Sequence, residues 1–242
     1  MHLGFAAVAR RFAFSCLWTG VLLAVPALAQ DAQTNPATDH PKNAHPIERY
    51  IHAVPSSPED YKTITAEGRF FWFVRSTVGL KSLSAGIISA GYGTAVDKPH
   101  EYGTHWVGFG QRYGMRLTGI STGNAIEATL GSAWGEDPRY FHTVHAPFGE
   151  RVKNILDLTV RAYHPDGERH PAYARYVAVF GNNFLSNTWR VPSENDWQHA
   201  LERSGEGFAG RAISNAVSEF VPQVWRKVRK QPDPYAVNAS NP

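Results

Sequence analysis

Apolar residues recur every three or four positions over several long segments, which is the spacing of one face of an α-helix. The pattern predicts helices over residues 65–79, 80–96, 106–134, 148–163 and 173–189, and a last helix that follows a capping box at 193–196 and ends near 229. Glycine, alanine and serine fill many of these positions, so neighbouring helices can approach closely. We therefore expect an all-α fold, a single-domain bundle of about six small-residue-rich helices within residues 59–230.

The same periodicity predicts which side of each helix is buried. In the central helix the predicted buried face consists of Trp106, Gly110, Tyr113, Leu117, Ile120 or Ser121, Asn124 and Ala128. In the segment 173–189 it consists of Tyr173, Val177, Phe180 and Phe184. In the last helix it consists of Leu201, Phe208, Ala212, Ala216, Phe220 and Val224. Residues 106–117 also fit the two-residue alternation of a β-strand, so two interpretations stay open there.

The first 29 residues have the pattern of a cleaved signal peptide. Arg10 and Arg11 precede an uncharged apolar run over 12–25, and Ala-Leu-Ala at 27–29 is the small-x-small pattern that signal peptidase recognises. The alternative is a retained membrane anchor, because the apolar run is nearly long enough to span a bilayer. Polar composition further predicts a disordered linker over 30–58 and a disordered tail over 231–242.

Removal of the predicted signal peptide changes the cysteine content and the net charge of the chain. The single cysteine, Cys16, lies in the predicted signal peptide, so the mature chain has no thiol and can fold in an oxidising compartment without disulfides. Loss of Arg10 and Arg11 leaves 22 basic side chains against 21 acidic ones, a net charge of +1. Such a balanced chain lacks the basic character of a nucleic-acid-binding protein. We expect an exported protein of the periplasm or cell envelope.

Several charged and amide side chains interrupt the small-residue faces of the predicted helices. Arg112 and Arg116 lie four residues apart, and Asn124 and Glu127 lie three apart on the same helix. A second such group lies in the last helix at Asn215 and Glu219. Buried polar groups need partners, so our preferred interpretation is a hydrogen-bond network between helices. The alternative is a polar cavity that binds a small anionic ligand through Arg112 and Arg116.

The run Glu136-Asp-Pro-Arg-Tyr-Phe141 is the most distinctive short motif in the chain. We interpret it as a rigid corner between helices, in which Asp137 caps the turn and Arg139 offers a planar fork for a carboxylate. The alternative is an acid/base group made of Glu136, Asp137 and His142. The candidate polar pocket therefore comprises Arg112, Arg116, Asn124, Glu127, Asp137, Arg139, Asn215 and Glu219, and no residue is assigned a catalytic role.

A metal site is a weaker possibility. His142 and His145 lie three residues apart, and Asp137 or Glu136 would supply a third ligand. The His-Glu-x-x-His pattern is absent, as are the phosphate-binding, dinucleotide-binding and nucleophile-elbow motifs. We predict no metal and no cofactor.

The chain resembles a family of bacterial exported proteins with no established activity. The resemblance covers about residues 70–229 and rests on Gly-Gln-Arg-Tyr-Gly at 110–114, Asn124, the motif at 136–141, Ile-Ser-Asn at 213–215 and Glu-Phe-Val-Pro at 219–222. It implies a compartment and one domain, and it implies no reaction. His142 and His145 fall outside the family's pattern, which counts further against a metal.

The sequence favours a binding or structural helical domain of the cell envelope, with a membrane surface or another envelope component as its partner. An envelope hydrolase that uses Glu127, Asp137 and Arg139 is the first alternative. A small outer-membrane β-barrel is the second, because residues 106–117 alternate and because glycine and aromatic residues are abundant. The three-to-four spacing over 148–163 and 197–228 argues against that second alternative.

Overall fold

The computed structural model describes residues 61–143 and 146–228. The predicted signal peptide, linker and tail lie outside these residues. The described chain is predominantly helical, and its only sheet is one two-stranded hairpin, which confirms the predicted all-α bundle. None of the helices in these two ranges is long and apolar enough to cross a membrane.

Five long helices make up most of the domain: α4 (Ala66–Val78), α5 (Leu80–Ala95), α6 (Trp106–Trp134), α7 (Phe148–Val160) and α10 (Trp197–Val228). The strands are β1 (Arg161–Tyr163) and β2 (Arg169–Pro171). Shorter elements are η2 (His100–Tyr102), α8 (Tyr173–Tyr176), the π-turn η3 (Val177–Gly181), α9 (Asn182–Leu185), η4 (Ser186–Thr188) and η5 (Pro192–Glu194).

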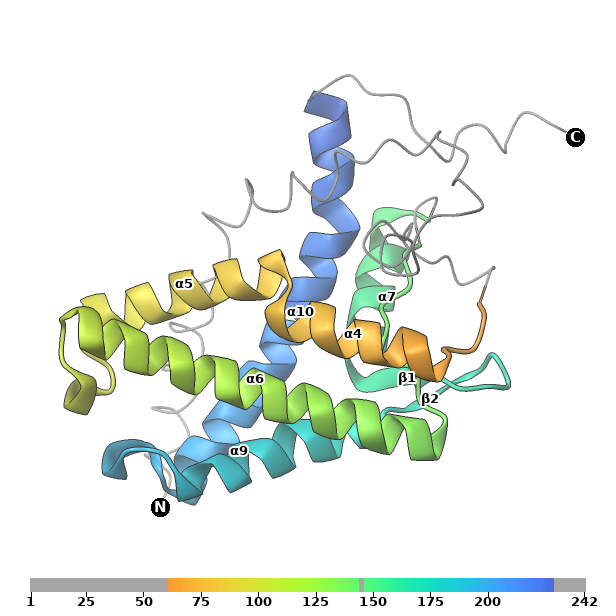
Figure 1. Cartoon of the computed structure of the whole chain (residues 1–242). Helices are drawn as coiled ribbons and strands as arrows, with labels where there is room; N and C mark the ends of the chain where they lie inside the picture. The colour runs from red at the N-terminus through yellow and green to blue at the C-terminus, as the bar shows by residue number, and fades with distance from the viewer. Residues whose placement is uncertain (1–60, 144–145, 229–242) are drawn as a thin grey trace, which may run out of the picture.

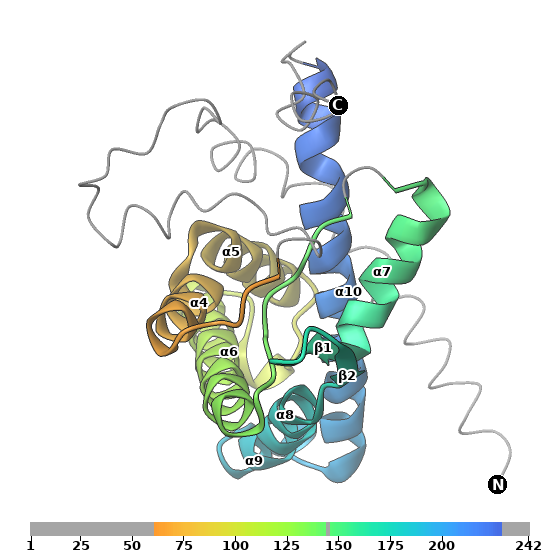
Figure 2. The same ribbon diagram turned by 90° about the vertical axis from the view of Figure 1, so that its right-hand side faces the viewer.

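The helices form two layers. In the first layer, α6 lies between the α4–α5 pair on one side and the α8–α9 segment on the other (Figure 1). Helix α10 crosses behind this layer and packs along α7. Seen from the side, α4, α5 and α6 lie on one flank of the domain and α7 lies on the opposite flank (Figure 2).

Local hydrogen bonds explain most of the helix ends. Thr65 caps α4, because its hydroxyl accepts a hydrogen bond from the Gly68 N–H at 3.1 Å. Helix α6 ends at Gly135, whose left-handed backbone (φ 74°) suits a residue without a Cβ. The predicted capping box at 193–196 is wrong. The carboxylate of Asp196 caps α10 through the His199 N–H at 2.8 Å, whereas Ser193 binds Glu101 of the α5–α6 loop.

Two predicted helices end earlier than the periodicity suggests. Helix α7 stops at Val160 because residues 161–163 pair antiparallel with 169–171, and a turn at 164–167 closes this hairpin. The helix predicted over 173–189 contains a π-turn and gives way to a 3-10 turn after Leu185. The strand interpretation of 106–117 is also wrong, since this segment is the first part of α6.

The buried faces predicted for the central helix, for 173–189 and for the last helix are largely wrong. The buried residues of α6 are Gly108, Arg112, Glu127 and Gly131, and Trp106 at its start is 85% exposed. Those of α10 include Ala200, Ser204, Asn215 and Glu219, whereas Leu201 and Val224 are exposed. The predicted stripe Tyr173, Val177, Phe180 and Phe184 is also exposed. Helices α6 and α10 are rotated so that their small, amide and charged residues face the centre, because their partners lie there.

A small aromatic core lies beside the hairpin. Phe141, Leu158 and Tyr163 are buried together, with Tyr61 and Tyr140 packed against them. The ring of Phe141 meets that of Tyr163 edge-on at 4.8 Å between centroids, a favourable aromatic geometry. This cluster fixes the last residues of the 136–141 motif against α7 and β1.

Close packing at the start of α6 gives a prediction from two glycines on the same helix. A Cβ at Gly108 would lie 2.2 Å from the carbonyl oxygen of Tyr102, whereas nothing lies within 4 Å of a Cβ at Gly110. We expect Gly108→Ala to lower the free energy of unfolding by about 1–3 kcal/mol through overpacking. Gly110→Ala should raise it by up to about 1 kcal/mol through helix propensity. Urea denaturation of both variants checks this, and equal effects would contradict the packing at Gly108.

Candidate functional site

The eight residues predicted to form a polar pocket do not surround one cavity. The structure places them in several separate networks, and each of the eight side chains bonds to another part of the chain. Most of these partners are backbone carbonyls or buried ions of opposite charge. The preferred interpretation, a network between helices, describes these contacts better than a ligand cavity does.

Arg112 organises the loop between α5 and α6. Its guanidinium donates to the carbonyl oxygens of Lys98 (2.8 Å), Gly103 (2.6 Å) and Pro99 (2.7 Å). It also contacts the Asp97 carboxylate at 3.4 Å. Because its donors are directed at the loop, Arg112 holds this loop in place. These contacts do not resemble those of an anion-binding site.

Three further candidates tie pairs of helices together. Arg116 on α6 donates to the carbonyl of Ser82 on α5 at 3.1 Å. Other ties join Asn124 to the Thr77 hydroxyl at 3.1 Å and Asn215 to the Thr159 hydroxyl at 3.4 Å. These contacts set the register between neighbouring helices, which is a structural role.

Glu127 lies at the centre of the domain in an ion triad with Arg175 and Arg211. Arg175 donates to one carboxylate oxygen of Glu127 at 3.0 Å, and Arg211 of α10 donates to the other. The second end of the Arg175 guanidinium donates to three carbonyls at the α7–β1 junction, those of Leu158, Thr159 and Arg161. Burial, together with the neighbouring Arg175, lowers the pKa of Arg211 to about 10. The triad thereby joins α6, α8 and α10 and fixes the start of the hairpin.

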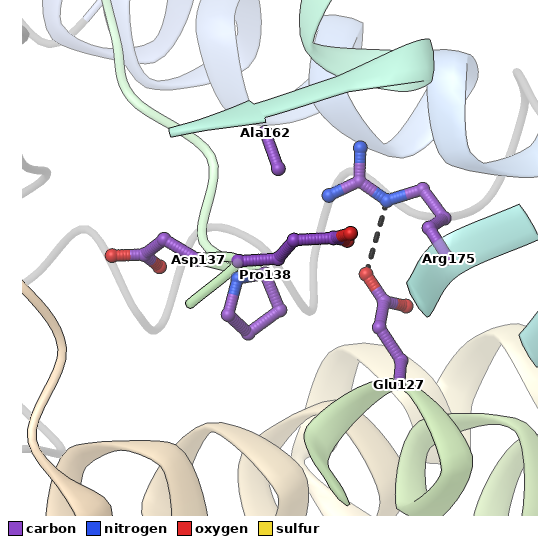
Figure 3. Close-up of a pocket in the computed structure, with 6 residues that line it drawn as sticks. Glu127, Asp137, Pro138, Ala162 and Arg175 are labelled. Atoms are coloured by element: carbon purple, nitrogen blue, oxygen red, sulfur yellow. Dashed lines mark hydrogen bonds and ion pairs between the residues drawn. The ribbon is translucent and has the colours of Figure 1, made fainter. Parts of the chain in front are cut away.

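A narrow interstice separates the triad from the 136–141 motif. It is lined by Glu127, Glu136, Asp137, Pro138, Ala162 and Arg175, and it is too small to admit a water molecule. Figure 3 shows Glu127 and Arg175 bonded across it, while the carboxylate of Asp137 points away from this pair. The residues of the hydrolase alternative, Glu127, Asp137 and Arg139, therefore do not converge on a space that could hold a substrate.

The Asp-Pro-Arg corner forms as the motif predicts. The Asp137 carboxylate accepts hydrogen bonds from the backbone N–H and the guanidinium of Arg139, the shortest at 2.6 Å. The backbone of Asp137 also pairs with Tyr163. Arg139 reaches on to the carbonyl of Lys62 at 2.6 Å, so the corner also fastens the chain that leads into α4.

Glu136 has a different role from its neighbour Asp137. Its two carboxylate oxygens accept the Ala174 N–H at 3.1 and 3.0 Å, at the beginning of α8. Burial raises the pKa of Glu136, and this hydrogen bond opposes the rise. A carboxylate at a helix N-terminus satisfies donors that the helix itself leaves open. Glu136 is therefore a capping group for α8.

Arg69 of α4 is a buried cation that the sequence analysis did not single out. It is 8% exposed, and its Nη1 has no hydrogen-bond partner within the described chain. Burial lowers its pKa, and the nearby Asp137 opposes this. A Cβ at Gly131 would lie 2.9 Å from the Arg69 Nη1 atom, so the glycine leaves room for the guanidinium.

Glu219 of α10 forms the second large polar cluster. It is 2% exposed and binds Arg151 at 2.9 Å, the Tyr140 hydroxyl at 2.9 Å and the His142 ring at 3.2 Å. Burial alone would raise its pKa, but the contacts from His142 and Arg151 lower it to about 2. Of the acid/base group proposed from sequence, His142 therefore belongs with Glu219, apart from Glu136 and Asp137.

The partners of these carboxylates were missed by the sequence analysis. Arg175, Arg211 and Arg151 carry no motif, and each lies far along the chain from the acid that it binds. One signal was present for Arg175, which is the only charged residue between 171 and 189. A lone arginine in such a segment needs a buried partner.

No group of three or more His, Cys, Asp or Glu side chains within 61–143 and 146–228 is arranged to hold a metal ion. His145 lies outside the described residues, so the His142–His145 spacing has no structural counterpart here. A general base must direct a lone pair at its substrate. The carboxylates of Glu127, Asp137 and Glu219 direct their oxygens at arginines of the chain instead.

The central triad predicts that replacing a buried arginine lowers the free energy of unfolding much more than replacing an exposed one. Arg175→Met would leave part of the Glu127 charge and three carbonyls without their partner, so we expect a loss of about 3–5 kcal/mol in the free energy of unfolding. Arg161→Gln, which removes an exposed ion pair with Asp157, should cost less than about 1 kcal/mol. Urea denaturation followed by circular dichroism measures both. Similar losses in the two variants would show that the triad does not hold the domain together.

Glu219 gives a prediction for the pH dependence of stability. Its pKa in the folded chain is about 2, below the ordinary value of 4.5, so its stabilising effect is complete above about pH 4.5 and is lost as pH falls towards 2. Over that range the unmodified protein should lose about 3 kcal/mol more unfolding free energy than Glu219→Gln. Urea denaturation at a series of pH values tests this, and parallel curves for the two proteins would contradict it.

Comparisons with known proteins complete the description of the site. No protein-family model, no curated protein and no solved structure matches the chain. The function proposed below is therefore inferred from the residues of this chain and from the resemblance that its motifs carry.

Proposed function

We propose that this chain is an exported protein of the cell envelope whose helical domain binds or supports another envelope component and catalyses no reaction. The observation that carries the proposal is that its buried carboxylates already have partners within the chain. Glu127, Asp137 and Glu219 are each bonded to an arginine of the same chain, and the interstice beside Glu127 is closed to water.

The outer surface supports the same proposal. Large apolar side chains are exposed on the long helices, while charged side chains occupy the centre. Contiguous apolar surface is typical of sites that contact proteins or membranes. A domain of this kind acts through its surface, because its buried carboxylates at Glu127, Asp137 and Glu219 are engaged by arginines of the same chain.

Export is supported by the sequence. The basic residues at 10–11, the apolar run at 12–25 and Ala-Leu-Ala at 27–29 form a signal-peptide pattern. The resemblance of the 136–141 motif to a family of exported proteins supports the same compartment. The absence of cysteine from residues 30–242 is compatible with an oxidising environment.

Fractionation of a bacterial host that expresses the full chain tests the proposal. We expect the protein in the periplasmic or envelope fraction, with an intact mass that corresponds to a chain beginning at Gln30. Ala29→Arg should accumulate unprocessed, because signal peptidase requires a small residue at that position. A cytoplasmic protein that retains residues 1–29 would overturn export.

A second measurement tests the absence of catalysis. The purified protein is assayed against ester, peptide and glycosidic substrates of the envelope, alongside Glu127→Gln. The proposal expects no turnover in either protein. Turnover that a folded Glu127→Gln variant loses would establish the hydrolase alternative instead.

A further inference from the structure

One flank of the domain exposes large apolar side chains that no described part of the chain covers. We call this surface the α5–α6 apolar face, and it consists of Leu80, Ile87 and Trp106. These residues lie on α5 and on the first turn of α6, helices that pack along one another (Figure 1). Trp106 is 85% exposed, so its indole projects almost wholly into the surroundings.

Aromatic contacts make this surface continuous. The ring of Trp106 lies 5.8 Å from that of Phe109, which in turn stacks on Tyr113 at 6.2 Å. Tyr113 then packs against α5 at Gly86, where an added Cβ would lie 2.7 Å from its ring. The apolar side chains of the two helices therefore form one surface.

The face is free of charge, whereas the opposite flank is not. Helix α5 has no charged residue between 82 and 95, and the charges of α6 are Arg112, Arg116 and Glu127, none of which is exposed. On the other flank, α7 and the hairpin expose Glu150, Lys153, Arg161, Asp166 and Glu168. Figure 2 shows that the two flanks point in opposite directions.

The loop that connects the two helices of the face carries an exposed cation. Lys98 is exposed in the α5–α6 loop, which leads directly to Trp106. The acidic groups of this loop bond within the protein, Asp97 to Arg112 and Glu101 to Ser193. Tryptophan, tyrosine and lysine together are typical of the membrane–water boundary, where their apolar parts enter the lipid and their polar ends stay at the headgroups.

We propose that the α5–α6 apolar face lies on a lipid bilayer, with Trp106 and Ile87 in the interfacial zone and Lys98 against the lipid phosphates. This inference rests on the proposed envelope location and names the envelope component as lipid. The flank with α7 and the hairpin then faces water. Insertion of apolar side chains provides the attraction, so high salt leaves it largely intact.

Vesicle sedimentation tests the proposal with the processed chain that begins at Gln30. The vesicles contain either phosphatidylcholine alone or an equal mixture of phosphatidylcholine and phosphatidylglycerol. We expect binding to both at low and at high salt. Lys98→Glu should remove only the extra binding to the anionic mixture, because Lys98 contributes charge and no inserted surface.

Aspartate variants of two equally exposed residues, one on each flank, distinguish the two flanks. Ile87 is 57% exposed on α5, and Leu156 is 58% exposed on α7. Ile87→Asp and Trp106→Asp should each weaken vesicle binding by about tenfold or more, whereas Leu156→Asp should bind as the unmodified chain does. Circular dichroism should show the same helical content in all of them, since each side chain is exposed.

Three results would overturn the proposal. The first is an unmodified protein that fractionates with the envelope yet binds neither kind of vesicle, which leaves the proposed function standing and removes lipid as the partner. A second is an equal loss of binding in Leu156→Asp. The last is an unmodified protein that binds no vesicle and is a dimer in sedimentation equilibrium, while Ile87→Asp is a monomer. This result would show that the face binds a second copy of the chain.

Discussion

The domain depends on one buried carboxylate held between two arginines. Glu127 of α6 receives Arg175 from the segment after the hairpin and Arg211 from α10, so three distant parts of the chain meet at one charge. The apolar core beside it is small, and many of the buried apolar residues are alanines. Charges removed from water need well-aligned partners, and this requirement fixes how α6, α8 and α10 can be oriented.

The same requirement explains the distribution of apolar and polar side chains. Arg112 and Glu127 of α6 face the centre, while Trp106 at the start of the same helix is exposed. On α10 the inward positions of Asn215 and Glu219 likewise leave Val224 exposed. The exposed apolar surface is thus a consequence of the polar centre. A membrane surface or another partner that covered it would remove these apolar groups from water.

Local patterns predicted the helices but not their orientation. The cap at Thr65 and the corner between Asp137 and Arg139 were predictable, because the bonded residues lie within three positions of each other. The pairing of Glu127 with Arg175 was not, since 48 residues separate them and any arginine in the chain is chemically suitable. Periodicity misplaced the buried faces because it gives weight to apolar residues, whereas in this domain ion pairs determine the inward side.

The position of α10 at the end of the described chain affects the order in which the domain can assemble. Arg211 follows its partner Glu127 by 84 residues, and Glu219 follows Tyr140 by 79. Contacts between such distant residues form late and slow the folding of a chain. Until α10 is present, Glu127 and Tyr140 lack these partners. A protein that crosses a membrane before it folds benefits from that delay.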